Sequence, residues 1–391
     1  MGILFSVISL KYFLAPYVWM SICWLLLSAF LFAKSKNSTQ KYISSNFGFI
    51  ALICAALELY SYSAIKSLVE ESRHARYKGY FIANDILGYG PVKGQTVRIK
   101  RYHNQRLIYD VLYTIANNGL RISPPSHDDH CILFFGDSFT FGEGIRDHET
   151  MPYVVGELSG YKEYNFGFHG YGPHQMLSAI EHGFVESVVH CEPGYAVYTV
   201  LVEHVARAAG YSFWDKHGPK YVLLHEGVKY TGHFDDDQAD GDTIGYRARI
   251  QAQVEKSYVY KKYFENRYRI TDEDVRRFIE IVDASRKKLV KIYPGLQFHV
   301  ILWPEDTGGA YDRVRTGLLE RGIKLHYINE ILSDWPIHMS RYILSDYDQH
   351  PNAFAQAQIA KYVVSQILST QVNSGNNGMA YSRGSTTSGH D

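Results

Sequence analysis

The sequence predicts an α/β domain, with a parallel sheet flanked by helices, behind an N-terminal transmembrane hairpin. Two observations predict this. From residue 131 onward, short apolar runs alternate with longer segments of helical periodicity. This pattern is typical of buried parallel strands joined by helical crossovers. Two long apolar stretches with few charges precede it near the N-terminus, which is typical of membrane-spanning helices.

Residues 13–33 form an uncharged apolar stretch of 21 residues. As a helix, such a stretch is long enough to cross a hydrocarbon core of roughly 30 Å. Leu31 stands where a cleavable signal peptide would carry a small residue, which favours a retained helix. The second stretch, 47–65, is weaker because it contains Glu58, and a carboxyl group inside a membrane usually has a partner. A buried or interfacial helix is the alternative for this stretch.

The loop between the two stretches carries Lys34, Lys36 and Lys41. Short basic loops tend to stay in the cytoplasm. This predicts a membrane protein whose large C-terminal domain is extracytoplasmic or periplasmic. Basic residues also follow the second stretch, and they favour the opposite orientation.

We divide the chain into four parts. Residues 1–66 are predicted to form the two transmembrane helices, and 67–126 a juxtamembrane segment with a lead-in of strands and turns. Residues 127–370 form the α/β domain, in which the aromatic and charged stretch 210–270 is predicted to be an insertion. Residues 371–391 are polar and predicted to be a disordered tail.

The predicted elements of the α/β domain follow from apolar periodicity and from proline and glycine at the ends. Strands are expected at 131–135, 163–166, 195–202, 298–303 and 324–328. Helices are expected at 149–159, 171–184, 271–295, 311–321 and 351–368. In such a sheet, chemistry gathers at the carboxyl ends of the strands.

Composition excludes several classes of function. Lys+Arg and Asp+Glu both number 40, so the basic excess typical of a nucleic-acid-binding protein is lacking. No phosphate-binding loop, dinucleotide-binding loop or zinc motif occurs, so neither a cofactor nor a metal is predicted. The four cysteines show no characteristic spacing, and we expect no disulfide framework: Cys23, Cys54, Cys131 and Cys191.

The segment FFGDSFTFGEG (134–144) places Ser138 directly after an apolar strand, at a glycine-rich turn before a helix. A serine hydroxyl needs a base within hydrogen-bond reach to become a nucleophile. It also needs N–H donors aimed at the oxyanion that develops, and a helix N-terminus supplies them. The sequence therefore predicts that Ser138 is a catalytic nucleophile whose own N–H lines the oxyanion hole.

GDSFTFGEG resembles the first signature block of the SGNH hydrolases, also called the GDSL family. The resemblance implies an SGNH-type three-layer sandwich for residues 131–368. NFGFHGYGPHQ (165–175) resembles the second block, and Gly170 matches the glycine whose N–H lines the oxyanion hole. The alternative is that the glycines in this segment only make a tight turn.

SDYDQHPNAFAQAQ (345–358) resembles the last block of the family, with His350 as the catalytic base. The commonest family spacing would put an aspartate at Tyr347. Asp348 matches a variant spacing and is predicted to orient His350, with Asp346 as the reserve candidate. The alternative is a surface Asp and His at a helix cap.

The sequence departs from the family at the third block, which usually carries an asparagine whose side chain is an oxyanion donor. Here His204 and Arg207 follow the strand at 195–202. We predict His204 as a substitute oxyanion donor and Arg207 as a substrate-binding residue. The alternative is a purely structural role for both.

The resemblance implies serine-dependent ester hydrolysis or acyl transfer through Ser138, His350 and Asp348. Residues 85–121 look like the lead-in of membrane-linked bacterial relatives, which often act on acyl groups of cell-surface glycans. An acylated small molecule or glycan is therefore the expected substrate, by analogy alone. Two alternatives stay open: an O-acyltransferase, in which a sugar hydroxyl replaces water, and a non-catalytic glycan-binding or assembly protein on the same fold.

Overall fold

The structure is a computed structural model that describes residues 16–73, 79–126, 130–212, 214–236, 257, 259, 270–304, 309–335 and 337–368. It contains two compact units. The first consists of Met1–Tyr77, Lys100–Leu107 and His233–Thr271, and the second of Lys78–Ile99, Ile108–Gly232 and Asp272–Asp391. The predicted tail at 371–391 and most of the predicted insertion lie outside the described residues.

The first unit contains a helical hairpin of α2 (Pro16–Lys34) and α3 (Ser38–Arg73). The helices approach closely at Gly48, where an added Cβ would lie 2.8 Å from Ser28 Oγ. Large apolar side chains point outward, for example Leu26 at 67% and Phe49 at 62% exposure. Ser38–Ala64 is long and apolar enough to cross a membrane, and the apolar segment of α2 is shorter. Exposed apolar surface of this extent is typical of helices that meet lipid or a partner.

Glu58 lies in the middle of α3 and is only 3% exposed. Its Oε2 accepts hydrogen bonds from Ser257 Oγ at 2.9 Å and from the Val259 N–H at 3.1 Å. The partners expected for a carboxyl group in this apolar stretch are therefore supplied by residues 199 and 201 positions away in the chain, within the same unit.

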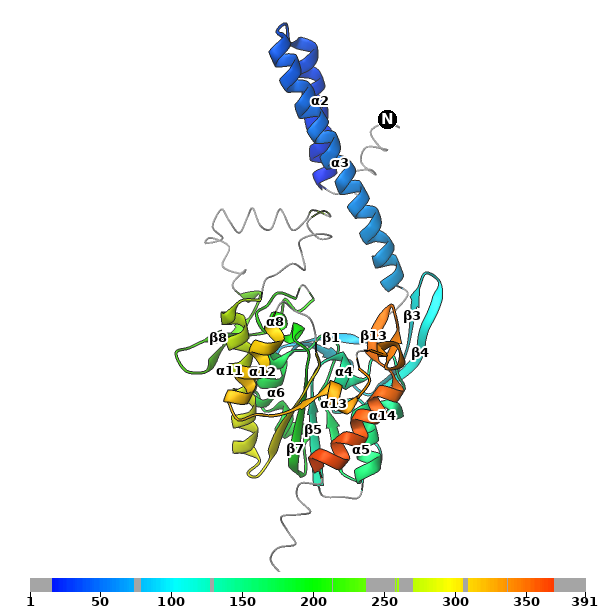
Figure 1. Ribbon diagram of the computed structural model, residues 1–391, viewed down its shortest axis with the longest axis vertical. Helices are drawn as coiled ribbons and strands as arrows, with labels where there is room; N and C mark the ends of the chain where they lie inside the picture. Colours follow the sequence, from blue (N-terminus) through cyan, green and yellow to red (C-terminus); the bar gives the residue numbers. More distant parts are fainter. Residues whose placement is uncertain are drawn as a thin grey trace, which may run out of the picture. The chain divides into compact units, whose positions relative to one another are not determined.

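The second unit is built on a five-stranded sheet in which all pairings are parallel. The strand order is β11 (Lys324–Tyr327), β10 (Gln297–Leu302), β7 (Glu192–Val200), β5 (His130–Phe135) and β6 (Lys162–Asn165). Helices cover both faces of the sheet (Figure 1). The predicted α/β fold with a parallel sheet flanked by helices is confirmed.

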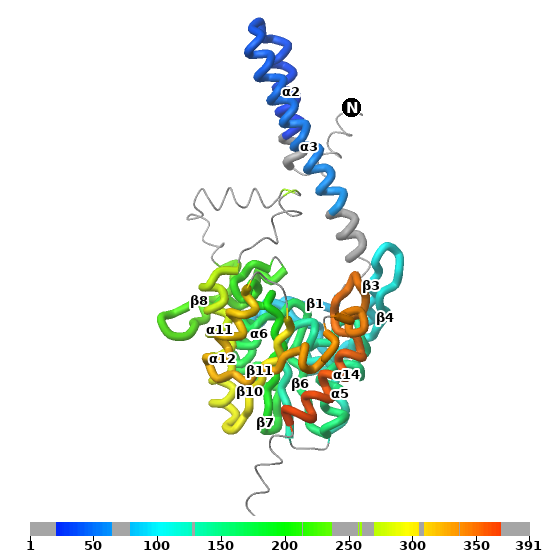
Figure 2. The backbone as a smooth tube through the Cα atoms, viewed as in Figure 1, coloured from blue at the N-terminus to red at the C-terminus, as the bar shows by residue number. Residues whose placement is uncertain are grey.

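One face of the sheet packs against α5 (Met151–Ser159) and α14 (Ala353–Tyr362), which lie beside one another (Figure 2). Ile132 and Phe134 of β5 enter this core together with Val155 and Ile359 from the two helices. The opposite layer contains α6 (Pro173–Glu181), α8 (Glu203–Ala208), α11 (Asp272–Ile292) and α12 (Ala310–Glu320). Two-sided burial explains why the inner strands β5, β7 and β10 are largely apolar.

The predicted elements agree with the structure to within a few residues, with two differences. The helix expected at 171–184 ends at Glu181, and a separate helix, α7 (Phe184–Val188), follows Gly183, whose φ is +71°. The helix expected at 351–368 is α14 followed by a π-helical turn, Val363–Ile367. Two hairpins form the lead-in, β1 (Phe81–Asn84) with β2 (Gly88–Pro91) and β3 (Gln95–His103) with β4 (Arg106–Ile115).

The expectation of no disulfide was wrong, because Cys131 and Cys191 form one. Cys131 lies in β5 and Cys191 directly precedes the neighbouring strand β7, where Cys131 aligns with Pro193. Strand order, which the spacing of the cysteines does not encode, brings the two together. Cys23 and Cys54 in the helical hairpin are free.

Replacing both Cys131 and Cys191 by alanine is expected to lower the free energy of unfolding by about 2–4 kcal/mol, because the bridge closes a loop of 60 residues in the unfolded chain. Urea unfolding with and without reductant measures this. Reductant should destabilise the wild type and leave the double variant unchanged. The Cys23→Ala/Cys54→Ala variant is the matched control, and equal reductant sensitivity of wild type and Cys131/Cys191 variant would contradict the prediction.

Candidate active site

Ser138 is the first residue of α4 (Ser138–Phe141), a single turn that follows strand β5, which lies between β7 and β6 in the sheet. Gly136 allows the sharp exit from the strand, since its φ is +151° and an added Cβ would lie 2.2 Å from Thr140 Oγ1. The Asp137 side chain caps the turn by accepting a hydrogen bond from the Phe139 N–H. The strand end and this cap therefore hold Ser138 at the carboxyl edge of the sheet.

Three predicted residues lie together in one hydrogen-bonded chain. Ser138 Oγ lies 2.8 Å from His350 Nε2, and His350 Nδ1 lies 2.6 Å from Asp348 Oδ1. Because a carboxylate only accepts, the neutral ring carries its proton on Nδ1 and its Nε2 accepts from the Ser138 hydroxyl. This is the arrangement that general-base activation of a serine requires.

His350 and Asp348 come from β13 (Asp348–Pro351), which pairs with β12 (Ile343–Ser345) just before α14. Gln356 of α14 joins this segment to the nucleophile turn. Its amide donates to Phe139 O at 2.8 Å, and its oxygen accepts from the Met151 N–H at 2.7 Å. These contacts hold His350 and Ser138 in register although 212 residues separate them.

The surroundings of His350 favour its protonated form. Burial alone lowers its pKa, but the nearby carboxylates of Glu143, Asp348 and Asp137 outweigh burial and raise the pKa to about 9. Glu143 also faces the ring nitrogen that contacts Ser138, with its Oε2 3.5 Å from His350 Nε2. Sequence reasoning assigned no role to this glutamate, and only its place in the FTFGEG segment signalled it.

Gly170 lies in the loop between β6 and α6, with φ at +72°. An added Cβ would lie 2.6 Å from Trp214 Nε1 and 2.8 Å from Tyr89 Oη, so this position needs glycine. Among the described residues, the backbone N–H groups of Ser138 and Gly170 donate to no protein acceptor. Both donors are thus available to a ligand, and their joint action on an oxyanion stays a prediction.

His204 is fully buried, and both of its ring nitrogens face protein groups. Nδ1 lies 2.8 Å from the Tyr198 hydroxyl, and Nε2 lies 3.2 Å from Asp137 Oδ2, though poorly aligned for a hydrogen bond. Burial lowers its pKa to about 4, although Asp137 acts in the opposite direction, so the ring is neutral. The oxyanion-donor role predicted for His204 would require the ring to leave these partners.

Arg207 also faces Asp137. Its Nη1 donates to Asp137 Oδ2 and to Tyr171 O, both at 2.8 Å. Burial alone raises the pKa of the Asp137 carboxyl, but Arg207 and His204 more than offset burial and hold that pKa well below its usual range. In the structure, therefore, Arg207 neutralises a buried carboxylate next to Ser138, and the substrate-binding role predicted for it stays untested.

Arg121 is a further residue that sequence reasoning missed. It is 2% exposed and donates to the carbonyl oxygens of Phe141, Gly142 and Ile145, while pairing with Asp147 at 2.7 Å. These bonds satisfy the carbonyls at the end of α4. They fix the loop that carries Glu143.

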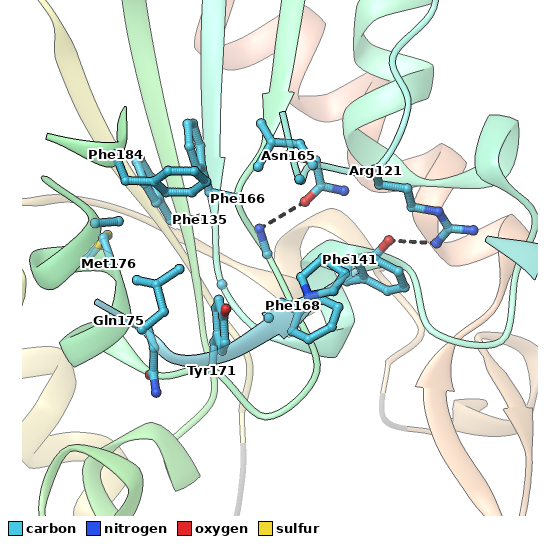
Figure 3. A pocket seen from close by; sticks show the side chains of 18 of the residues that line it. Arg121, Phe135, Phe141, Asn165, Phe166, Phe168, Tyr171, Gln175, Met176 and Phe184 are labelled. Carbon is cyan, nitrogen blue, oxygen red and sulfur yellow. Dashed lines mark hydrogen bonds between the residues drawn. The ribbon is translucent and has the colours of Figure 1, made fainter. Parts of the chain in front are cut away.

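A cavity of about 60 Å³ is lined by residues that flank Ser138, such as Phe141, and by residues that flank Gly170, such as Phe168 and Tyr171 (Figure 3). Its lining includes the aromatic side chains of Phe135, Phe141, Phe166 and Phe168, and it does not include the Ser138–His350–Asp348 chain. Asn165 bridges the two loops here by accepting from the Gly167 N–H and donating to Thr140 O. The cavity is therefore part of the packing that supports the loops.

Comparison with known proteins finds no matching family model and no matching curated protein. Among solved structures, the chain is similar to a putative lipolytic protein of the G-D-S-L family from Desulfitobacterium hafniense DCB-2, at 13% identity over 60% of this chain and 97% of that one, with a TM-score of 0.33. It is also similar to an acetyl xylan esterase from Butyrivibrio proteoclasticus, at 10% identity over 68% and 67% of the two chains, with a TM-score of 0.36. A carbohydrate esterase family 2 enzyme from Corynascus thermopiles (Myceliophthora fergusii) matches at 14% identity over 68% and 76%, with a TM-score of 0.36. Likeness this distant carries no argument about activity, so the functional case depends on the site geometry.

Proposed function

We propose that the chain is a serine-dependent ester hydrolase or acyltransferase of the SGNH type. The observation that carries the proposal is the Ser138–His350–Asp348 chain, with separations of 2.8 and 2.6 Å, at the carboxyl edge of a parallel sheet. Ser138 and His350 are 212 residues apart in the chain and yet in hydrogen-bond contact. This contact supports a catalytic role, because the alternative of a surface Asp and His at a helix cap does not explain why a serine hydroxyl lies beside the His.

In the proposed reaction, Ser138 Oγ attacks the ester carbonyl carbon while its proton passes to His350 Nε2. The carbonyl electron pair moves onto oxygen, where the N–H groups of Ser138 and Gly170 stabilise the charge. Collapse of this intermediate expels the alcohol, which takes the proton from His350. Water then attacks the acyl-enzyme in the esterase, and a sugar hydroxyl does so in the acyltransferase.

We further propose that the substrate carries its acyl group on a cell-envelope or extracellular glycan, with the membrane hairpin as anchor. The Cys131–Cys191 disulfide supports an oxidising, extracytoplasmic location for the catalytic domain. Trp214 supports a sugar ligand, because its half-exposed indole packs beside Gly170, and an aromatic face with a polar N–H suits a sugar.

The test is covalent labelling of the full chain in lipid nanodiscs with a fluorophosphonate probe, followed by peptide mapping. We expect one modified residue, Ser138, and loss of both labelling and p-nitrophenyl acetate turnover in Ser138→Ala. Labelling that persists in Ser138→Ala would refute the proposed nucleophile. No labelling of the folded wild type would instead favour the non-catalytic glycan-binding or assembly protein.

A further inference from the structure

Glu143 is a buried carboxylate that contacts the catalytic base from a second direction. It lies just after α4, is 7% exposed, and has no place in the reaction described above. Its Oε2 lies 3.5 Å from His350 Nε2 and 2.6 Å from His169 Nδ1. Its Oε1 accepts a hydrogen bond from the Tyr109 hydroxyl at 3.3 Å.

The position of Glu143 matters because Nε2 is the nitrogen that takes the Ser138 proton. Asp348 stabilises the imidazolium at Nδ1, and Glu143 faces the other nitrogen. Charges that are withdrawn from water interact more strongly than exposed ones. A carboxylate at this distance therefore stabilises the imidazolium that forms when Ser138 attacks.

Glu143 also links the base to the predicted oxyanion loop. His169 immediately precedes Gly170, and its Nδ1–H donates to the same carboxylate oxygen that faces His350. The backbone oxygen of His169 accepts from the Tyr89 hydroxyl at 2.7 Å, and its Nε2 lies 3.3 Å from the Tyr80 hydroxyl. One carboxylate thus contacts the base and the loop that carries the Gly170 N–H.

We propose that Glu143 is a positioning residue for the Ser138 reaction, holding protonated His350 at Nε2 and tying the base to the oxyanion loop through His169. This inference rests on the proposed function. Glu143 takes no proton in it: the Ser138 proton moves to His350 Nε2 and then to the leaving alkoxide.

The charged groups around His350 determine the expected pH dependence. Asp348 faces it from β13, Asp137 from the turn before α4, and Glu143 from the loop after α4; together they raise the pKa of His350 to about 9 against the effect of burial. A protonated His350 cannot accept the Ser138 proton, so activity should rise with pH through this value. The acidic limb of kcat/KM reports this pKa in the free enzyme.

The experiment compares pH profiles of kcat/KM for p-nitrophenyl acetate in the full-length wild type and in Glu143→Gln. Loss of the charge disfavours the imidazolium, so the acidic limb should move to lower pH by roughly one unit or more. The plateau rate should also fall, because the transition state loses the same stabilisation. A lower rate with an unmoved limb would show a merely structural role and overturn the proposal.

Glu163→Gln is the matched control. Glu163 is another buried carboxyl of the same unit, 1% exposed, and burial raises its pKa to about 8. Glu163 is not among the groups that shift the pKa of His350, so an amide at this position should not change the titration of that ring. The control should leave the limb in place.

A readout without turnover separates this inference from the proposed function. The side-chain NMR titration of His350, assigned by comparison with His350→Gln, follows its protonation directly. A downward shift in Glu143→Gln without any ester turnover in the wild type would refute the proposed reaction and leave the coupling standing. Identical titration of His350 in both proteins would overturn the coupling, whatever the enzyme hydrolyses.

Discussion

Asp348→Asn is expected to lower kcat for p-nitrophenyl acetate by about 10⁴-fold, a smaller loss than that expected for Ser138→Ala. Asp348 is 3% exposed and lies 2.6 Å from His350 Nδ1. An amide there removes the charge that stabilises the imidazolium. It can also donate to Nδ1, which would move the ring proton to Nε2 and leave that nitrogen unable to accept the Ser138 proton.

Asp346→Asn is the matched control, because Asp346 is an exposed aspartate only two residues away. The control should keep wild-type kcat, and both variants should keep the wild-type unfolding midpoint. The reverse result, a collapse of kcat in Asp346→Asn with Asp348→Asn nearly intact, would move the orienting role to Asp346.

Arg207→Ala is expected to destabilise the catalytic domain by roughly 3–5 kcal/mol, because it leaves a buried carboxylate without its cation. Asp137 is 1% exposed and depends on Arg207 Nη1 at 2.8 Å. The unfolding midpoint of the full chain should fall on the order of 10 °C, as followed by circular dichroism. A change in KM alone, at an unchanged midpoint, would favour the predicted substrate-binding role of Arg207.

Two further variants sharpen this test. Arg98→Ala removes the Arg98–Asp110 pair on β3 and β4, in which the arginine side chain is 63% exposed, and should leave the midpoint almost unchanged. Adding Asp137→Asn to Arg207→Ala removes the buried negative charge that Arg207 no longer neutralises. The double variant should therefore recover part of the lost stability. A double variant as unstable as the sum of the two singles would show that charge is not the cause.

The sequence by itself determined the α/β architecture and the position of Ser138. Apolar runs such as 131–135 are local signals, and a strand buried on both faces must be apolar wherever it lies in the sheet. The segments around Ser138, Gly170 and His350 are equally local, so their resemblance to the signature blocks of the SGNH hydrolases was sufficient to select all three as candidates. The structure brings Ser138, His350 and Asp348 into one chain of contacts.

Only the tertiary structure decided which side chains meet across the chain. Cys131 and Cys191 pair because β7 is the neighbour of β5, which cysteine spacing does not reveal. His204 and Arg207 face Asp137 because a buried carboxylate must be neutralised by whichever cation and donor fold against it. The role proposed for Glu143 depends on the β12–β13 hairpin, which places His350 Nε2 3.5 Å from Glu143 Oε2 although the two residues are far apart in the sequence. Hydrophobic periodicity can be recognised from residues that are close in the sequence. Ion pairs and hydrogen bonds between distant residues depend on distances that exist only in the folded chain.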